Sequence, residues 1–445
     1  MMRRRDALTA LGLLPLAGSA MPQSDLLRPP PGASSLPKGL GRPIDADYFG
    51  AHLHRWVLQP GERAVPTRWP DGLAGSLRMW DSGTRWGDIA PSPGVWSFER
   101  MDAYVDGAQA HQAAVLYTLG STPRWASARP DEPGPYGPGC AAEPVRMAHW
   151  EEYVTRVAQR YRGRIQAYEL WNEPQFSDYA LDRQYPGFFT GSVAQMVALA
   201  HAARAVLDRV DPAAVLSTPG FVNGPHRLER FLRSGGASHV QAVAYHFYAS
   251  DSVQFMQEVA AVRAVSQRAG VSSLPLWNTE SGVETHGEGE RLPEGIKRRL
   301  NEAEAAAMTA QLLVLGAALQ LQKFYYYAWD NDRSGMVDRG GAKTLRFAAM
   351  QRVQQWLVGA RLSPPTMDAA SVVQVRGMRD KRHFLLAWSA DGKPRPMPVP
   401  EGWKLVSTES LTGDVDAVAT VAGAAQRVTV SAMPICMSLA SGVGA

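Results

Sequence analysis

Eight short apolar runs alternate with amphipathic segments along most of the sequence. The runs are Tyr48–His54, Ser76–Trp80, Ala113–Leu119, Ala167–Trp171, Ala214–Thr218, Ala242–Tyr248, Leu274–Thr279 and Lys323–Ala328. The helical patterns between them include Phe98–Gln112, His149–Arg162, Ser192–Arg209 and Leu300–Leu321. Strands that alternate with helices form parallel sheets, and eight such units close into a barrel. The sequence therefore predicts an α/β protein with a (β/α)8 TIM barrel over residues 44–360, ending in a helix at Leu345–Val358.

The pattern changes after residue 360. Ser371–Val375, His383–Ala387, Trp403–Ser407 and Gln426–Val430 are alternating or β-branched, and no helical period interrupts them. Turn residues such as Asp391-Gly392 separate these runs. Short strands bounded by turns are typical of an all-β unit. We expect a small β-sandwich-like accessory domain over residues 361–445.

The N-terminus has the pattern of an export signal. Arg3–Arg5 precede an apolar stretch, Ala7–Ala17, which ends in small residues. This pattern predicts a signal peptide over residues 1–20, followed by a Pro-rich leader over 21–43. The pair Arg4-Arg5 also fits a twin-arginine signal, so the export route stays open. No later run is long enough to span a membrane, so we expect a periplasmic or secreted protein without a membrane span after signal removal.

Composition excludes several classes of partner. The net charge is +4, and no block of five like charges occurs, so no nucleic acid partner is expected. Two cysteines, Cys140 and Cys436, are too few for a metal cluster or a disulfide framework. Whether these two pair with each other stays open at this level, as does the oligomeric state.

Two glutamates stand where barrel chemistry is expected, at the C-terminal ends of strands. Glu173 follows the fourth run in Asn172-Glu173-Pro174, and Glu280 ends the seventh. Partial desolvation at the barrel mouth would raise the pKa of Glu173 for general acid catalysis. Paired carboxylates about 5–5.5 Å apart are typical of retaining glycoside hydrolysis. Glu169 is either solvated or a charge partner deeper in the barrel.

Four segments carry a family resemblance that covers about residues 45–355. Tyr168–Pro174 (YELWNEP) resembles the acid/base motif of glycoside hydrolase clan A, and Trp277–Ser281 (WNTES) is similar to that clan's nucleophile strand. Arg78–Gly83 and Thr122–Ser127 resemble family 39-like members of the clan. The resemblance implies that Glu173 is the acid/base and Glu280 the nucleophile.

The same resemblance implies roles for the residues around the glutamates. Asn172 would bind the sugar 2-hydroxyl, and Arg78 and Tyr248 would keep Glu280 ionised. Contacts to the sugar hydroxyls or to the sugar face are implied for His54, His246, Trp125 and Trp329.

Other functions remain as alternatives. His52-Leu-His54 resembles the metal motif of amidohydrolases, but the fifth strand supplies no histidine and the fourth no lysine. A catalytically inactive polysaccharide-binding barrel is a further alternative, and we expect neither a metal nor a cofactor. The long Pro/Gly-rich loop at Ala128–Glu143 and the export signal favour a bacterial extracellular polysaccharide with β-linkages as substrate. An exo-acting enzyme of the β-xylosidase type, on oligosaccharides, is the alternative substrate assignment.

Overall fold

The computed structural model describes residues 40–58, 61, 65–70, 74–182, 187–287, 299–413, 415–417 and 427–441. The expected signal peptide and residues 21–39 of the leader lie outside this set. In the part of the chain that is described, no helix combines the length and apolar character needed to cross a bilayer.

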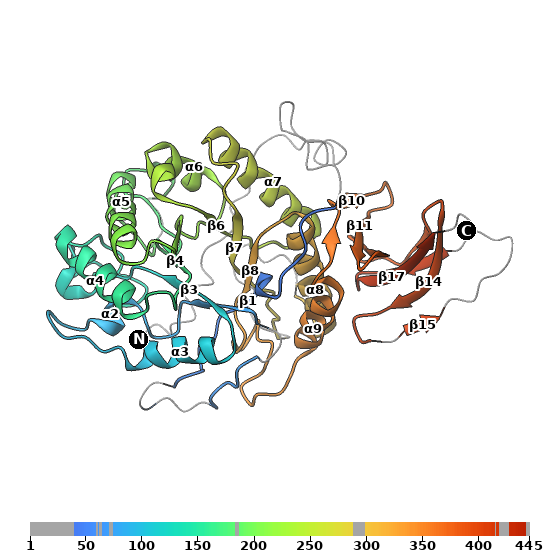
Figure 1. Ribbon diagram of the computed structural model, residues 1–445, viewed down its shortest axis with the longest axis horizontal. Helices are drawn as coiled ribbons and strands as arrows, with labels where there is room; N and C mark the ends of the chain where they lie inside the picture. The colour runs from blue at the N-terminus through green and yellow to red at the C-terminus, as the bar shows by residue number, and fades with distance from the viewer. Residues whose placement is uncertain are drawn as a thin grey trace.

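Eight parallel strands form the barrel, in agreement with the sequence prediction (Figure 1). They are β1 (Phe49–Ala51), β2 (Ser76–Met79), β3 (Ala114–Thr118), β4 (Ala167–Glu169), β5 (Val215–Ser217), β6 (Val243–His246), β7 (Leu276–Ser281) and β8 (Lys323–Tyr326). Neighbouring strands pair in chain order, and β8 pairs with β1. Parallel bridges between Ser217 and Ala242 and between Phe221 and Tyr245 join the β5 and β6 sides, so the sheet closes.

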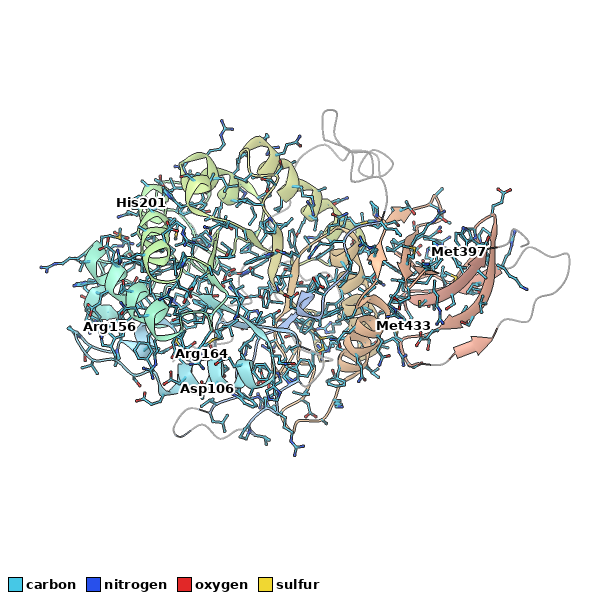
Figure 2. All side chains as sticks on the ribbon, viewed as in Figure 1. Asp106, Arg156, Arg164, His201, Met397 and Met433 are labelled. Atoms are coloured by element: carbon cyan, nitrogen blue, oxygen red, sulfur yellow. The ribbon has the colours of Figure 1, made fainter. Side chains whose placement is uncertain are left out.

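Helices connect the strands and form the outer layer. They are α2 (Trp86–Ile89), α3 (Glu99–Ala110), α4 (Met147–Arg160), α5 (Val193–Val210), α6 (His226–Arg233), α7 (Ser252–Arg268), α8 (Glu302–Ala318) and α9 (Leu345–Leu357). Capping boxes explain where α5 and α8 begin. The side chains of Ser192 and Asn301 accept hydrogen bonds from the backbone N–H groups of Gln195 and Glu304. Arg164 and Asp106 form an ion pair at the outer surface of this layer (Figure 2).

Most of α8 is buried, unlike an ordinary surface helix of a barrel. Every residue from Ala305 to Ala318 is buried. A helix that is apolar all round must be covered on both sides. The barrel covers one side of α8, and the C-terminal β-region lies against the other (Figure 1).

The C-terminal β-region contains a seven-stranded antiparallel sheet and a two-stranded one. The large sheet holds β9 (Arg361–Leu362), β10 (Thr366–Met367), β11 (Val372–Arg379), β12 (Arg382–Ser389), β14 (Trp403–Glu409), β15 (Val415–Ala417) and β17 (Ile435–Ser441). The small one pairs β13 (Arg395–Pro398) with β16 (Arg427–Val430). The fold class expected from the sequence, a (β/α)8 barrel with a C-terminal all-β region, is therefore confirmed.

Alternation along β12 explains how the large sheet packs on both faces. Leu386 and Trp388 belong to the core shared with the barrel. Leu385 and Ala387 point the other way, into a second core that contains Met397 of β13 (Figure 2). Successive side chains on a strand face opposite sides, so one strand serves both cores.

The sequence pattern did not indicate β17, although it lies between β12 and β14 in the large sheet. Its sequence, Ile-Cys-Met-Ser-Leu-Ala-Ser, has no aromatic residue and only one β-branched residue, Ile435, and these are the residue types that mark strands. Hydrogen bonding to a neighbour on each side stabilises this strand more than its own propensity does.

Candidate active site

The groups that could perform catalysis meet at the C-terminal mouth of the barrel. Glu173 directly follows Asn172 in the turn after β4, and Glu280 lies in β7. Both glutamates are buried, with exposed fractions of 6% and 2%. One carboxylate oxygen of Glu173 lies within 4.8 Å of one of Glu280. This separation leaves space for a bond to be cleaved between the groups but is too short to admit an additional catalytic water between them.

The backbone at Glu173 is strained, and its neighbours hold it in place. Glu173 has a φ of 42°, in the left-handed region that costs a non-glycine residue about 1–3 kcal/mol. Its N–H donates to the carbonyl of Gly220 at 2.9 Å, and the Gly220 N–H donates to the carbonyl of Trp171 at 2.9 Å. These two bonds link the turn after β4 to the segment after β5. They stabilise the conformation that turns the Glu173 side chain into the mouth.

Only glycine fits at position 220. A Cβ atom there would lie 2.3 Å from Nε2 of His246 and 2.8 Å from Oε1 of Glu169. Both distances are well below van der Waals contact, so any side chain would displace these groups. The close approach of the Gly220 backbone is therefore part of how the site is assembled.

Arg78, in β2, connects the buried polar groups of the site. Its Nη1 donates to Oε2 of Glu280 at 2.8 Å, and its Nη2 donates to Oδ1 of Asn172 at 2.7 Å. Its Nε donates to Oε2 of Glu169 at 2.9 Å, and Thr118 donates to the same oxygen at 2.8 Å. Glu169 is thus the buried charge partner of Arg78, the second of the two possibilities left by the sequence.

Charge and burial act in opposite directions on Arg78 and Glu280. Burial lowers the pKa of Arg78, but the charges of Glu169 and Glu280 raise it more, so the guanidinium stays protonated. Burial raises the pKa of Glu280 above its ordinary value. The Arg78 charge and the Tyr248 hydroxyl, which donates to Oε1 of Glu280 at 2.8 Å, oppose that rise. These contacts favour the ionised form of Glu280.

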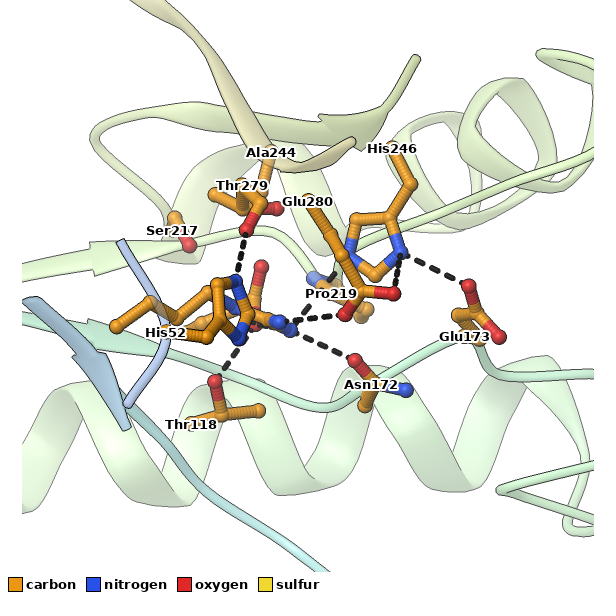
Figure 3. Close-up of polar contacts among 12 residues, drawn as sticks. His52, Thr118, Asn172, Glu173, Ser217, Pro219, Ala244, His246, Thr279 and Glu280 are labelled. Atoms are coloured by element: carbon orange, nitrogen blue, oxygen red, sulfur yellow. Dashed lines mark hydrogen bonds and ion pairs between the residues drawn. The ribbon is translucent and has the colours of Figure 1, made fainter. Parts of the chain in front are cut away.

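His246 lies between the two glutamates (Figure 3). Its Nδ1 is 2.9 Å from Oε1 of Glu173 and 3.9 Å from Oε1 of Glu280. Burial lowers the pKa of His246 to about 4, so the ring is neutral at neutral pH. Its Nε2 is 3.5 Å from Nη2 of Arg78, which can only donate. Nε2 therefore accepts, and Nδ1 carries the hydrogen and donates to Glu173.

Glu173 has a different protonation tendency from Glu280. Burial raises its pKa to about 7, and the Arg78 charge only partly opposes this. Glu173 is not in contact with Arg78; its one polar side-chain partner in the described residues is the neutral imidazole of His246. Carboxylates whose environments separate their pKa values can act one as acid and one as base or nucleophile.

Three of the other residues implied by the resemblance make no hydrogen bond or ion pair with the two glutamates in the described residues. His54 is half-buried, and its ring lies against Tyr327 with centroids 5.1 Å apart. Trp125 is also half-buried, and its Nε1 donates to the carbonyl of Ala90 at 2.8 Å. Trp329 is 2% exposed and packs edge-on against Phe347, so its ring belongs to the core. Their contacts with a sugar stay predictions.

The metal motif suggested by His52 and His54 does not assemble in the described part of the chain. The two rings are perpendicular, with centroids 6.4 Å apart, and Nε2 of His52 is 3.2 Å from the carbonyl of Thr279. Within the described residues, three potential metal ligands do lie together, and these are Glu173, His246 and Glu280. The Arg78 guanidinium at 2.8 Å from Glu280 already supplies a positive charge there, which disfavours a second cation.

Three further residues at the mouth were not assigned from the sequence. Asp81 follows β2, Tyr327 follows β8, and Tyr136 lies in the loop Ala128–Glu143. The Tyr136 hydroxyl donates to Oδ1 of Asp81 at 2.5 Å, and the Tyr327 hydroxyl donates to Oδ2 at 2.8 Å. Asp81 and Tyr327 each follow a barrel strand, and that position in the sequence could have identified them as candidate site residues. Nothing in the sequence pairs either with Tyr136.

Side-chain contacts hold the loop Ala128–Glu143 in place. Nη1 of Arg129 donates to both oxygens of Glu143 at 2.8 Å, and its Nη2 donates to Thr190 at 2.9 Å. Cys140, at the end of this loop, is a free buried thiol, and so is Cys436 in β17. The disulfide that the sequence left open is therefore not formed.

The fold and the paired glutamates define a class of (β/α)8 proteins with two opposed carboxylates after β4 and in β7. Solved structures of similar fold are glycoside hydrolases of families 39 and 30, which belong to clan A. A family 39 glycoside hydrolase from Bacteroides cellulosilyticus aligns at 15% identity and a TM-score of 0.66, over 90% of this chain and 83% of that one.

Two further solved structures align over 91% of this chain and 98% of their own. They are a glucosidase from Croceicoccus marinus, at 16% identity and a TM-score of 0.60, and a family 30 endoxylanase from Clostridium papyrosolvens, at 13% and 0.58. No protein-family model and no curated protein matches the sequence. These likenesses extend beyond the barrel into the C-terminal β-region.

Proposed function

We propose that the protein is a retaining glycoside hydrolase that cleaves β-linked glycosidic bonds in two displacements. The observation that carries this proposal is the pair of buried glutamates with oxygens within 4.8 Å. The two glutamates have different environments. Arg78 and Tyr248 donate hydrogen bonds to Glu280, whereas burial beside a neutral imidazole raises the pKa of Glu173 to about 7. One carboxylate is prepared to attack and the other to donate a proton.

In the first step, Glu280 attacks the anomeric carbon while protonated Glu173 transfers its proton to the leaving oxygen. The glycosidic bond breaks, and a glycosyl ester forms on Glu280. In the second step, Glu173, now a carboxylate, removes a proton from water, which attacks the anomeric carbon and releases Glu280. The Nδ1–H of His246 donates to Glu173 throughout and stabilises its ionised form between the steps.

Asn172 is placed to bind a substituent of the sugar next to the reacting carbon. Its Oδ1 accepts from Arg78 at 2.7 Å, which fixes the direction of the amide. The Nδ2 group then remains to donate to the 2-hydroxyl. A hydrogen bond at that hydroxyl strengthens as the transition state forms.

For the substrate, we propose a bacterial extracellular polysaccharide, cleaved by an exported periplasmic or secreted enzyme. The anchored loop Ala128–Glu143 beside the mouth supports an extended substrate, and the N-terminal signal pattern supports export. The named neighbours include both a glucosidase and an endoxylanase, so an exo-acting enzyme on oligosaccharides is the second candidate. The presence of both carboxylates with their supporting groups argues against an inactive binding barrel.

Product analysis on a panel of purified polysaccharides and oligosaccharides tests this proposal. Wild-type protein should release new reducing ends from at least one β-linked member, and a Glu280→Gln variant of unchanged shape should release none. The size of the first products separates endo from exo cleavage. Absence of new reducing ends from every member of the panel would contradict the proposed function.

Hydrolysis should proceed with retention of anomeric configuration, because two successive displacements restore it. Proton NMR spectra recorded in the first minutes should show the β-anomer of the product before mutarotation produces the α-anomer. Early appearance of the α-anomer would instead mean that a water attacks directly, which the carboxylate separation disfavours.

The activity should fall as the pH rises through about 7. Glu173 must be protonated to begin the reaction, and its pKa is raised to about 7, so deprotonation above that pH removes the acid. On the acid side, activity should fall as Glu280 becomes protonated, at a pH above that of an ordinary carboxyl group because burial raises its pKa. The measurement is kcat/KM across the pH range for a β-linked oligosaccharide, a substrate whose poor leaving group needs the proton of Glu173.

A matched control for this pH dependence is available on the outer layer. Burial raises the pKa of Glu258, in α7, to about 7 as well. Glu258→Gln should leave the alkaline limb in place, whereas Glu173→Ala should abolish it. If the limb disappears in Glu258→Gln and persists in Glu173→Ala, the assignment of the acid is wrong.

A further inference from the structure

Asp81 adds a further carboxylate at the C-terminal ends of the barrel strands. It follows β2 three positions after Arg78, which binds Glu280. Burial is the largest cause of the raised pKa of Glu173, and the charge of Asp81 adds to it. Burial also raises the pKa of Tyr136 and Tyr327, the two tyrosines that bind Asp81, and the charge of Glu280 adds to that rise. Asp81 has a φ of 59°, a left-handed conformation that favours glycine. The two tyrosine bonds hold the residue in that conformation.

The hydrogen bonds at Asp81 use every hydroxyl proton of the group. Tyr136 and Tyr327 each donate their one hydroxyl hydrogen to Asp81, at 2.5 and 2.8 Å. Each phenol oxygen and each carboxylate oxygen still has lone pairs, and Asp81 and Tyr136 are partly exposed. The surface formed by these three side chains, the Asp81 face, can therefore accept hydrogen bonds but cannot donate them.

The nearby cations cannot convert the Asp81 face into a site for anions. In the described residues no ion pair joins Asp81 to a basic side chain. Arg78 is buried and donates to Glu169, Glu280 and Asn172. Arg85 donates through Nε and Nη2 to Asp88, its guanidinium lies 3.8 Å above the Tyr136 ring, and its Nη1 is buried.

We propose that Asp81 is a substrate-binding residue that selects a sugar presenting hydroxyl or amino groups to it and rejects a uronic acid. An acceptor-only face with a net negative charge binds hydroxyl and ammonium donors, and it repels a carboxylate. The inference rests on the proposed glycosidase function and narrows its substrate class to neutral or amino sugars at this position.

The test uses matched sets of β-linked polymers in the gluco, galacto and manno series, each in neutral, amino and uronic forms. Wild-type protein should cleave a neutral or amino member at least about tenfold faster than its uronic counterpart. Asp81→Asn keeps the shape but replaces the charge and introduces a donor. It should lower the rate on the preferred polymer by about 10- to 100-fold, the value of hydrogen bonds to a charged group, and reduce the preference over the uronic form.

Tyr136→Phe is the matched control, because it removes one hydrogen bond to Asp81 and keeps the charge. It should lower the rate while the preference persists. The preference is a ratio of rates, so it does not depend on how much of a variant is folded. The inference is overturned if wild type cleaves the uronic form equally well, or if Asp81→Asn leaves the preference unchanged. Absence of cleavage of every polymer by wild type would instead overturn the proposed function itself.

Discussion

Glu280→Ala is expected to lower kcat by roughly 10⁴- to 10⁶-fold, because the covalent step then has no nucleophile. Glu280 is the carboxylate that Arg78 and Tyr248 bind at 2.8 Å, so its removal takes away the attacking oxygen and leaves the acid Glu173 in place. The rate should be measured on an activated aryl glycoside and on the polysaccharide that wild type cleaves.

Small anions should restore part of this activity. Azide can enter the space left by the Glu280 side chain and attack the anomeric carbon directly, which gives a glycosyl azide of inverted configuration. Arg78 retains Glu169 and Asn172 as partners in the variant, so the fold should survive, and a thermal melt checks this. Glu280→Gln, which keeps the side-chain volume, is the control for packing. Wild-type activity in Glu280→Ala would exclude Glu280 as nucleophile.

Glu173→Ala is expected to affect substrates according to their leaving groups. A poor leaving group needs a proton as the bond breaks, so its first step should slow by about 10²–10⁴-fold, the usual contribution of general acid catalysis. An activated phenol leaves without a proton, so that its first step should be nearly unaffected. The second step lacks its base with either substrate, so the glycosyl ester on Glu280 should accumulate with the aryl glycoside, whose first step stays fast.

Three measurements distinguish this outcome from a structural role of Glu173. The ratio of kcat/KM values for good and poor leaving groups should rise by the factor lost in acid catalysis. Mass spectrometry of the variant with an aryl glycoside should show a glycosyl adduct on Glu280. Glu173→Gln, which preserves the contact to His246 as an amide, should give the same ratio. An equal loss for both substrate classes would make Glu173 a binding or structural residue.

Local sequence patterns were sufficient to predict the barrel and the position of the two glutamates. Eight apolar runs are separated by segments with a helical pattern, and each run overlaps one of the eight barrel strands. In a closed parallel barrel all strands end at one mouth, so residues after the fourth strand and at the end of the seventh must meet there. Glu173 and Glu280 could therefore be placed together without knowledge of any distance.

The sequence implied different roles for the two glutamates, but only the tertiary structure decided the burial and the individual contacts of each carboxylate. The ion pair of Arg78 with Glu169 joins residues 91 positions apart, and the bond between Tyr327 and Asp81 joins residues 246 apart. The same holds for Trp329, whose burial and edge-on contact with Phe347 of α9 could not be seen in the sequence. Periodicity in a sequence reports which face of an element is apolar. Burial and hydrogen bonding at one atom depend on side chains from several elements, and these determine the protonation of Glu173, the tautomer of His246 and the acceptor-only character of the Asp81 face.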